Sequence, residues 1–150
     1  MEEIKPIGYM LSQTLRVYKN QLVAEFKNQK TGNTFEQFII LHLLHSNCDI
    51  IQQDLANYMQ KDKSIIVRQL NGLLEKNYVT RMTNTADKRK KNLILTDAGT
   101  EILKHMKEVA QEVSEKLLSG VTEDEIEIFR SVLNKIRANG YQNNEELHKC

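Results

Sequence analysis

The chain has 150 residues, of which 40% are hydrophobic and 27% are charged, and its formal net charge is +1. This length and composition predict one compact domain, and the longest dense apolar run, FIILHLL, is too short to cross a membrane. The acidic N-terminus has no apolar leader, and the two cysteines, Cys48 and Cys150, form no zinc or disulfide pattern. We therefore expect a cytoplasmic protein with free thiols and no membrane partner.

The near-neutral total charge conceals an uneven distribution. Residues 61–91 carry nine cations and three acids, a net charge of +6, whereas residues 97–130 carry nine acids and four bases, a net charge of −5. Such an asymmetry is expected of a protein with a local anion-binding face.

Apolar periodicity predicts two helices in the first third of the chain. Apolar residues recur at spacings of three and four over residues 6–29, as one face of a long helix requires. Thr34 and Gln37 then form a capping-box pattern, in which two residues one turn apart bond reciprocally through side chain and backbone. This pair predicts the start of a second helix through FIILHLLH.

Two shorter helices follow, separated by a tight turn. Asp49 and Gln52 fit another capping box and predict that the third helix starts directly after Asp49. Asp62 is expected to cap the fourth helix, over about residues 62–76. The inward stripe of that helix is apolar and consists of Ile66, Leu70, Leu73 and Leu74. Asn77 follows where helices commonly end in a left-handed residue, a conformation that asparagine tolerates.

Beyond the fourth helix the hydrophobic period changes from 3.6 to 2. The stretches YVTRMT and NLILT read as two short strands, which the polar segment at residues 84–91 links as a hairpin with a long tip. Thr96 is expected to cap a fifth helix that runs to about residue 118. Thr122 and Glu125 form a capping box for a last helix that ends at NG. The polar tail at residues 141–150 is expected to fray.

Two short helices joined by a tight turn and followed by a hairpin are typical of a winged helix-turn-helix. The predicted fold class is therefore mainly α with a small β-hairpin wing. One chain of this length has little core to cover the apolar stripes of its first, fifth and last helices, so we interpret these as dimerisation helices. The expected organisation is a single domain over residues 1–150. Within it, about residues 49–96 form the DNA-binding lobe, and about residues 5–30 and 97–138 form the dimerisation layer.

The sequence resembles the MarR-type winged helix-turn-helix transcriptional regulators. In that family the wing has an Asp-x-Arg pair, followed by a strand, a Leu-Thr pair and a glycine in the next helix. The string DKRKKNLILTDAG supplies these residues at matching spacing, as Asp87, Arg89, Leu95, Thr96 and Gly99. The helix-turn-helix region matches through Leu55, Ala56, Arg68 and Leu73. Three residues depart from the family pattern: Ile65 and Val67, where small hydroxyl residues are frequent, and Asn77, where glycine is frequent.

The resemblance implies a sequence-specific regulator, more often a repressor than an activator, that binds double-stranded DNA as a homodimer. Its fourth helix would enter the major groove of a pseudo-palindromic operator. Arg68 is the candidate for a base contact, because its guanidinium can match guanine bidentately. Lys63, Ser64 and Gln53 are candidates for phosphate contacts, and Val67 projects from the same turn. Arg68 could instead be a solvated or ion-paired residue, which the helix-turn-helix context disfavours.

The wing at residues 84–91 accounts for the densest cationic run of the chain. By its match to the family motif, Arg89 is expected to enter the electronegative minor groove. Asp87 would accept hydrogen bonds from that guanidinium and so structure the wing before DNA binds. Lys88, Lys90 and Lys91 would neutralise phosphates and make the affinity depend on salt.

Other classes of function fit the sequence less well. A glycine-rich phosphate loop and a nucleophile–base motif are both lacking, so neither enzymatic activity nor a cofactor is expected. His42 and Cys48 lie about 120° apart on a helix, with His45 between them, which disfavours a metal site. The family also implies a cleft for a small-molecule effector, which Tyr9, Tyr18, Phe38 and His42 could line. A metal- or thiol-responsive regulator, and a winged-helix interaction module without DNA binding, remain as alternatives.

Overall fold

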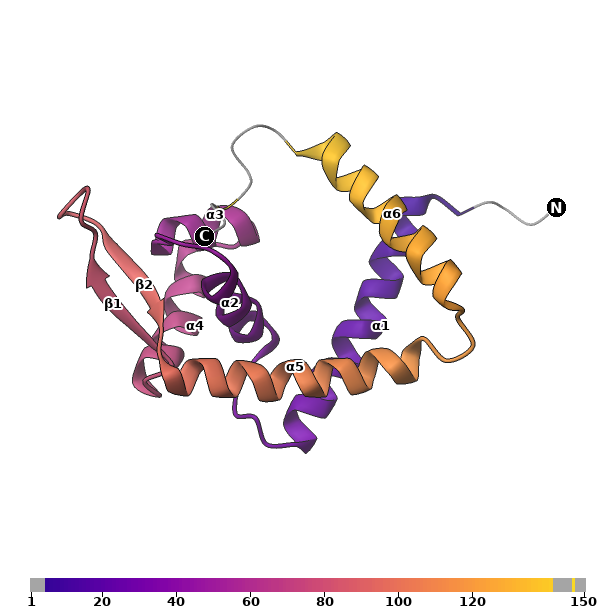
Figure 1. Ribbon diagram of the computed structural model, residues 1–150, viewed down its shortest axis with the longest axis horizontal. Coiled ribbons are helices and arrows are strands. Elements are labelled where there is room, and N and C mark those ends of the chain that lie inside the picture. The colour runs from indigo at the N-terminus through magenta and orange to yellow at the C-terminus, as the bar shows by residue number, and fades with distance from the viewer. Residues whose placement is uncertain (1–4, 142–146, 148–150) are drawn as a thin grey trace.

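The computed structural model describes residues 5–141 and 147, and it is mainly helical with one small sheet (Figure 1). The elements in chain order are α1 Ile7–Asn28, α2 Phe35–Ser46, α3 Gln52–Met59, α4 Lys63–Glu75, β1 Val79–Thr83, β2 Lys91–Leu95, α5 Asp97–Leu117 and α6 Glu123–Gly140. The two strands pair antiparallel, with Val79 opposite Leu95 and Thr83 opposite Lys91. The predicted fold class, mainly α with a β-hairpin wing, is confirmed.

The helices α2, α3 and α4 and the hairpin form one lobe, which is joined to the rest of the chain by the long helix α5 (Figure 1). The wing extends from this lobe at the end opposite to α1 and α6. Fully buried apolar side chains from several elements make up the core: Ile40, Leu41, Leu55, Ile66, Leu70, Leu73 and Met106. Each such burial contributes roughly 1.5–3 kcal/mol before entropy is counted, so this shared core fixes the position of α4 and the wing.

Threonine caps start three of the helices, as the sequence predicted. The Thr34 hydroxyl accepts from the Gln37 amide at 3.1 Å, and the Gln37 side chain accepts from the Thr34 amide at 3.0 Å. The same reciprocal pair joins Thr122 and Glu125. Thr96 accepts from the Gly99 amide at 3.0 Å and starts α5. These bonds satisfy amides that have no partner within the helix.

Of the two predicted aspartate caps, that of Asp49 is wrong, and that of Asp62 is correct in position but lacks the side-chain bond. Helix α3 begins at Gln52, and the Asp54 carboxylate accepts from the Ile51 amide at 2.9 Å. The cause is tertiary, because the Leu93 amide of β2 donates to the Ile50 carbonyl at 2.7 Å and holds the preceding segment against the wing. Asp62 occupies the N-cap position of α4, but its side chain makes no capping bond within the described residues. There the exposed carboxylate faces solvent and leaves the first turn to backbone bonds.

The end of α4 confirms the role predicted for Asn77. This residue has a φ of +57°, in the left-handed region. The Tyr78 amide donates to the Leu73 carbonyl and the Asn77 amide to the Leu74 carbonyl, both at 3.0 Å, which is the bonding pattern of a Schellman motif. The chain therefore reverses directly from α4 into β1.

Gly99 allows the hairpin to pack against the start of α5. A Cβ atom at this position would lie 2.1 Å from the Tyr78 carbonyl oxygen, far inside contact distance. The Thr96 hydroxyl also donates to the Asn77 carbonyl at 2.6 Å, across the same junction. The base of the wing is thus joined to both α4 and α5.

Two further expectations concern membranes and the tail. Among the described residues, no helix is long and apolar enough to cross a bilayer. Of the tail expected to fray, only Tyr141 and Leu147 are described, and Leu147 is partly buried against the core. The remaining tail residues lie outside the described part of the chain.

Candidate nucleic-acid interface

The first turns of α4 present polar and basic side chains away from the core. Lys63, Ser64 and Arg68 are exposed, whereas Ile66 and Leu70 are fully buried on the opposite face. Val67 is half-buried between these two faces. The helix therefore offers a short polar strip while its apolar stripe secures it to the lobe, an arrangement suited to entering a DNA groove.

Gln53 lies on the neighbouring helix α3 and is also exposed. Its side-chain amide donates to the side-chain oxygen Oδ1 of Asn57, one helical turn later, at 2.8 Å. This bond uses one of the two N–H groups of the Gln53 side chain. The other N–H group can therefore donate to a phosphate oxygen.

The tip of the wing is built by hydrogen bonds local to the hairpin. Beyond the last strand pair, the Asn84 amide donates to the Lys90 carbonyl at 3.0 Å, and the Lys90 amide donates to the Asp87 carbonyl at 3.0 Å. The second bond closes a tight turn over Asp87, Lys88, Arg89 and Lys90. Three consecutive cations are therefore carried on one turn at the end of the ribbon.

Asp87 and Arg89 form a bidentate ion pair within that turn. The Arg89 Nε atom donates to Oδ1 of Asp87 at 3.1 Å, and a terminal guanidinium nitrogen donates to Oδ2 at 3.2 Å. The Arg89 side chain nevertheless remains 91% exposed. Bonds from the Arg89 side chain, and then from its backbone amide, hold the pKa of Asp87 below its usual value. The pair therefore orients the guanidinium while leaving it accessible.

The other cations of the wing are less constrained. Lys88 and Lys90 are exposed, and neither forms an ion pair within the described residues. The Lys91 ammonium donates to the Thr83 hydroxyl at 2.8 Å across the two strands. Arg81, on β1, is a further exposed cation of the hairpin that the sequence interpretation did not assign to the DNA-binding set. Its position on a strand next to the cationic tip was the signal available for it.

Hydrogen bonds at the base of the wing tip involve three polar residues that were not predicted for the site: Asn84, Asn92 and Asp49. The Asn84 side-chain oxygen accepts from the Ala86 and Asp87 amides, at 2.9 and 3.0 Å. The Asn84 side-chain amide donates to Asn92 at 2.9 Å, and the Asn92 amide donates to Asp49 at 3.0 Å. An asparagine whose side chain accepts from the backbone amide two residues later is a known local signal for a turn. The pairing of Asn92 with Asp49, 43 positions apart, has no such signal.

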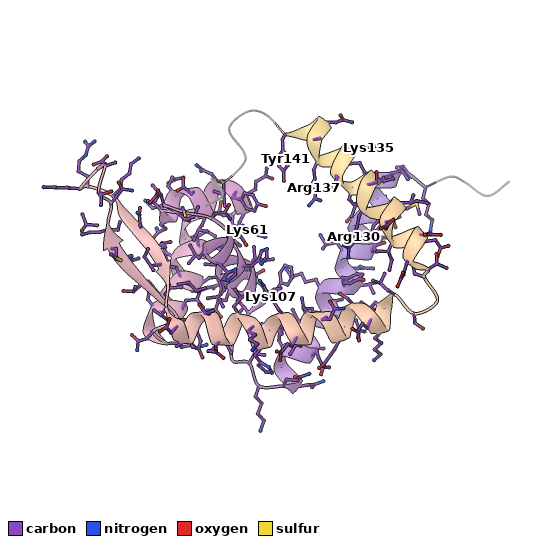
Figure 2. All side chains as sticks on the ribbon, in the orientation of Figure 1. Lys61, Lys107, Arg130, Lys135, Arg137 and Tyr141 are labelled. Carbon is purple, nitrogen blue, oxygen red and sulfur yellow. The ribbon has the colours of Figure 1, made fainter. Side chains whose placement is uncertain are left out.

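A separate cavity of about 540 Å³ lies between the end of α2 and the side of α5. It is lined by His45, Thr100, Leu103, Lys104, Lys107, Glu108 and Gln111. Figure 2 shows Lys107 on the side of α5 that faces the winged lobe and α6. Partial burial, followed by the charges of Lys107 and His45, lowers the pKa of His42.

The residues that the family resemblance suggested for an effector cleft do not line this cavity. Phe38 packs edge-on against Phe26, with 5.3 Å between ring centroids, and Tyr9 is 52% exposed. No group of metal-binding side chains occurs among the described residues. The expectation of free thiols does not hold for Cys48, which is not a free cysteine in this structure, and Cys150 lies outside the described residues.

Known proteins resemble this chain both in the candidate interface and in the surrounding fold. The family model described as "MarR family" matches residues 34–91, which include α2, α3, α4, β1 and the wing. The apo structure of wild-type MarR from E. coli superposes with a TM-score of 0.78 at 24% identity, covering 89% of this chain and 98% of that one.

Two further solved structures share the fold in the presence of ligands. CouR from Rhodococcus jostii RHA1, bound to p-coumaroyl-CoA, has a TM-score of 0.76 at 21% identity and covers 93% of this chain and 96% of that one. MepR from S. aureus, in complex with DNA, has a TM-score of 0.71 at 22% identity and covers 90% of this chain and 98% of that one. Residues 34–91 of the chain match the MarR family model, and the chain has the winged helix-turn-helix fold of the solved MarR-family structures.

Proposed function

We propose that this protein is a homodimeric, sequence-specific DNA-binding regulator, acting as a repressor, that reads a pseudo-palindromic operator. Helix α4 would occupy the major groove and the wing the minor groove. Lys63, Ser64, Val67 and Arg68 would contact DNA from α4 and Gln53 from α3, while Lys88, Arg89, Lys90 and Lys91 would do so from the wing.

The observation that carries this proposal is the exposure of both cationic elements on one rigid lobe. The polar strip of α4 and the wing are joined to a common core through Leu70 and the hairpin base, so they can bind one duplex together. Lys88 and Lys90 have no competing ion pair within the described residues, which leaves them available to phosphates. MepR, which shares this fold, was solved in complex with DNA, and this supports DNA binding by the present chain.

Dimerisation is supported by apolar side chains that the single chain leaves exposed on two helices. No residue of α6 is buried, and on α1 only Leu22 and Phe26 are. The exposed apolar residues of α6 include Ile128, Phe129, Val132 and Ile136, and those of α1 include Ile7, Leu15 and Val17. A second copy would bury these faces and place two recognition helices about one DNA turn apart.

Regulation by a small-molecule effector is supported by the cavity between α2 and α5. Its walls come from the helix that supports the winged lobe and from the helix that connects this lobe to α6. A ligand bound there with different affinity for two lobe arrangements would shift their populations and so change DNA affinity. CouR, which shares this fold, was solved bound to p-coumaroyl-CoA, and this supports the binding of a small molecule by the present chain.

The proposal is tested by selecting fragments of the source genome with the purified protein at near-physiological salt and sequencing them. We expect enrichment of a pseudo-palindrome, which the Arg68→Ala variant should no longer select. General, salt-sensitive binding without enrichment would contradict sequence-specific reading. Absence of binding at any salt would favour an interaction module. Metal analysis and thiol titration of the same sample test the metal- and thiol-responsive alternatives.

A further inference from the structure

A continuous chain of hydrogen bonds runs from the tip of the wing to the segment before α3. It begins at the Arg89 guanidinium, passes through the Asp87 carboxylate and the Asp87 amide, and reaches the side chain of Asn84. It continues from Asn84 to Asn92 at 2.9 Å and from Asn92 to Asp49 at 3.0 Å. The candidate minor-groove residue is thereby connected to the body of the lobe.

Asn92 is the central member of this chain and the most buried. Its exposed fraction is 9%, and its two side-chain groups serve different partners. The carbonyl oxygen accepts from Asn84, whereas the amide nitrogen donates to Asp49. The amide of Asn92 supplies both an acceptor and a donor, and neither an apolar residue nor a carboxylate can replace both bonds.

Asp49 is suited to the receiving end of the chain. It has a φ of +55°, which turns the backbone away from helical geometry in the segment between α2 and α3. Its neighbour Ile50 accepts the backbone bond from Leu93, so strand β2 is attached to this segment at two adjacent points. An isolated two-stranded ribbon is marginally stable in water, and such attachments decide the direction in which it projects.

We infer that Asn92 is a positioning residue for DNA recognition. By holding Asn84 against Asp49, it sets the direction of the wing turn and so brings Arg89 into register with α4. This inference rests on the proposed function, since it assigns to Asn92 a part in presenting a DNA-contacting side chain. It does not require Asn92 to contact DNA.

The pairing can be tested by a charge exchange. In Asn92→Asp a second carboxylate faces that of Asp49 at hydrogen-bonding distance, which is repulsive. Asp49→Asn alone keeps an acceptor for Asn92 and adopts a left-handed φ readily, so it is the matched control. In the double variant, Asp49→Asn with Asn92→Asp, the new carboxylate accepts from both Asn84 and the amide at position 49. The bond pattern is then restored in the opposite direction.

The first measurement is affinity for the operator at constant salt. Asn92→Asp should weaken binding about tenfold relative to the parent protein, because the hydrogen bond to Asp49 is lost and two carboxylates then repel each other. The same change made on the Asp49→Asn background should alter affinity less than about twofold. Equal losses on the two backgrounds would overturn the inference, because the added negative charge is common to both.

The second measurement tests whether the effect passes through Arg89. On an Arg89→Ala background, Asn92→Asp should cost less than about twofold in affinity, because the side chain being positioned is absent. A tenfold loss that persists without Arg89 would show that Asn92 acts on something else. Thermal unfolding of each variant verifies that the lobe remains folded.

The third measurement needs no DNA. Hydrogen exchange at the Ala86 and Asp87 amides should accelerate in Asn92→Asp and return to the parent rate in the double variant. Unchanged exchange in Asn92→Asp would overturn the inference. If Asn92→Asp does not fold, Asp49→Gly removes the same bond without backbone strain and should accelerate the same amides. If the parent protein binds no DNA, the proposed function fails, and these exchange rates still decide whether Asn92 positions the wing.

Discussion

The winged lobe and helix α6 differ in how fully the single chain covers their apolar surfaces. Leu70 and Leu73 of α4 have no exposed surface, whereas Ile128 of α6 is 65% exposed and Phe129 is 48% exposed. Both helices are amphipathic, so the hydrophobic period alone does not distinguish them. The difference indicates that the single chain covers the apolar core of the lobe but leaves the apolar face of α6 exposed, which is the face that a second copy would cover in the proposed homodimer.

The largest effect is expected from a change in the core of the lobe. Leu70→Ala should lower the free energy of unfolding by about 2–5 kcal/mol, because the lost methyl groups leave a cavity among fully buried neighbours. Denaturant unfolding measures this loss, which should not vary with protein concentration. Val132→Ala on α6 is the matched comparison, and its cost should increase with protein concentration. If both losses are equally independent of concentration, the contrast between the two regions is wrong.

A charged residue on the exposed apolar face of α6 tests whether this face is the dimer interface. Phe129→Glu should shift the protein from dimer to monomer, raising the dimer dissociation constant at least about tenfold, because a carboxylate would be buried without a partner. Sedimentation over a range of concentrations measures the shift, and circular dichroism should show that helix content is largely kept. An unchanged dimer would place the interface elsewhere.

A smaller effect is expected within the wing, where two neighbouring cations should behave differently. Arg89→Ala should weaken operator binding by about 1–3 kcal/mol and reduce the preference for A/T-rich flanks. Lys90→Ala should weaken binding to all DNA sequences about equally and reduce the slope of log affinity against log salt concentration by about one unit. Binding titrations at several salt concentrations separate the two. Equal, sequence-independent losses would contradict the minor-groove role of Arg89.

The smallest effect concerns the pH dependence of the wing turn. The Arg89 side chain, and then its backbone amide, lower the pKa of Asp87. A carboxylate whose pKa is lowered in the folded state stabilises the wing turn fully at pH values above its ordinary pKa of about 3.9. This stabilisation is lost as the pH falls through the lowered pKa of the folded state. The nuclear magnetic resonance signal of the Arg89 Nε–H should therefore change with a midpoint below 3.9. The Asp87→Asn variant should show no such transition, and global stability should hardly change because the pair is exposed.

Much of the fold could be predicted because its signals are local. Thr34 with Gln37, Thr96 with Gly99, and Thr122 with Glu125 each lie within one helical turn, so their sequence spacing is also their spatial spacing. The left-handed end of α4 at Asn77 follows from the same kind of short-range chemistry. The exposed residues of α4 followed from its apolar period, because burial of Ile66 and Leu70 determines which side faces outward.

The sequence by itself determined the helices, the hairpin and the cationic run at its tip, since helix period, capping chemistry and turn residues act over a few positions. Only the tertiary structure decided the role of Asp49. Its sequence context fits a helix cap, but the backbone bond from Leu93 to Ile50 and the side-chain bond from Asn92 draw it to the wing instead. A contact between residues 43 positions apart leaves no periodic trace in the sequence, because it forms only when the shared core brings β2 beside the start of α3.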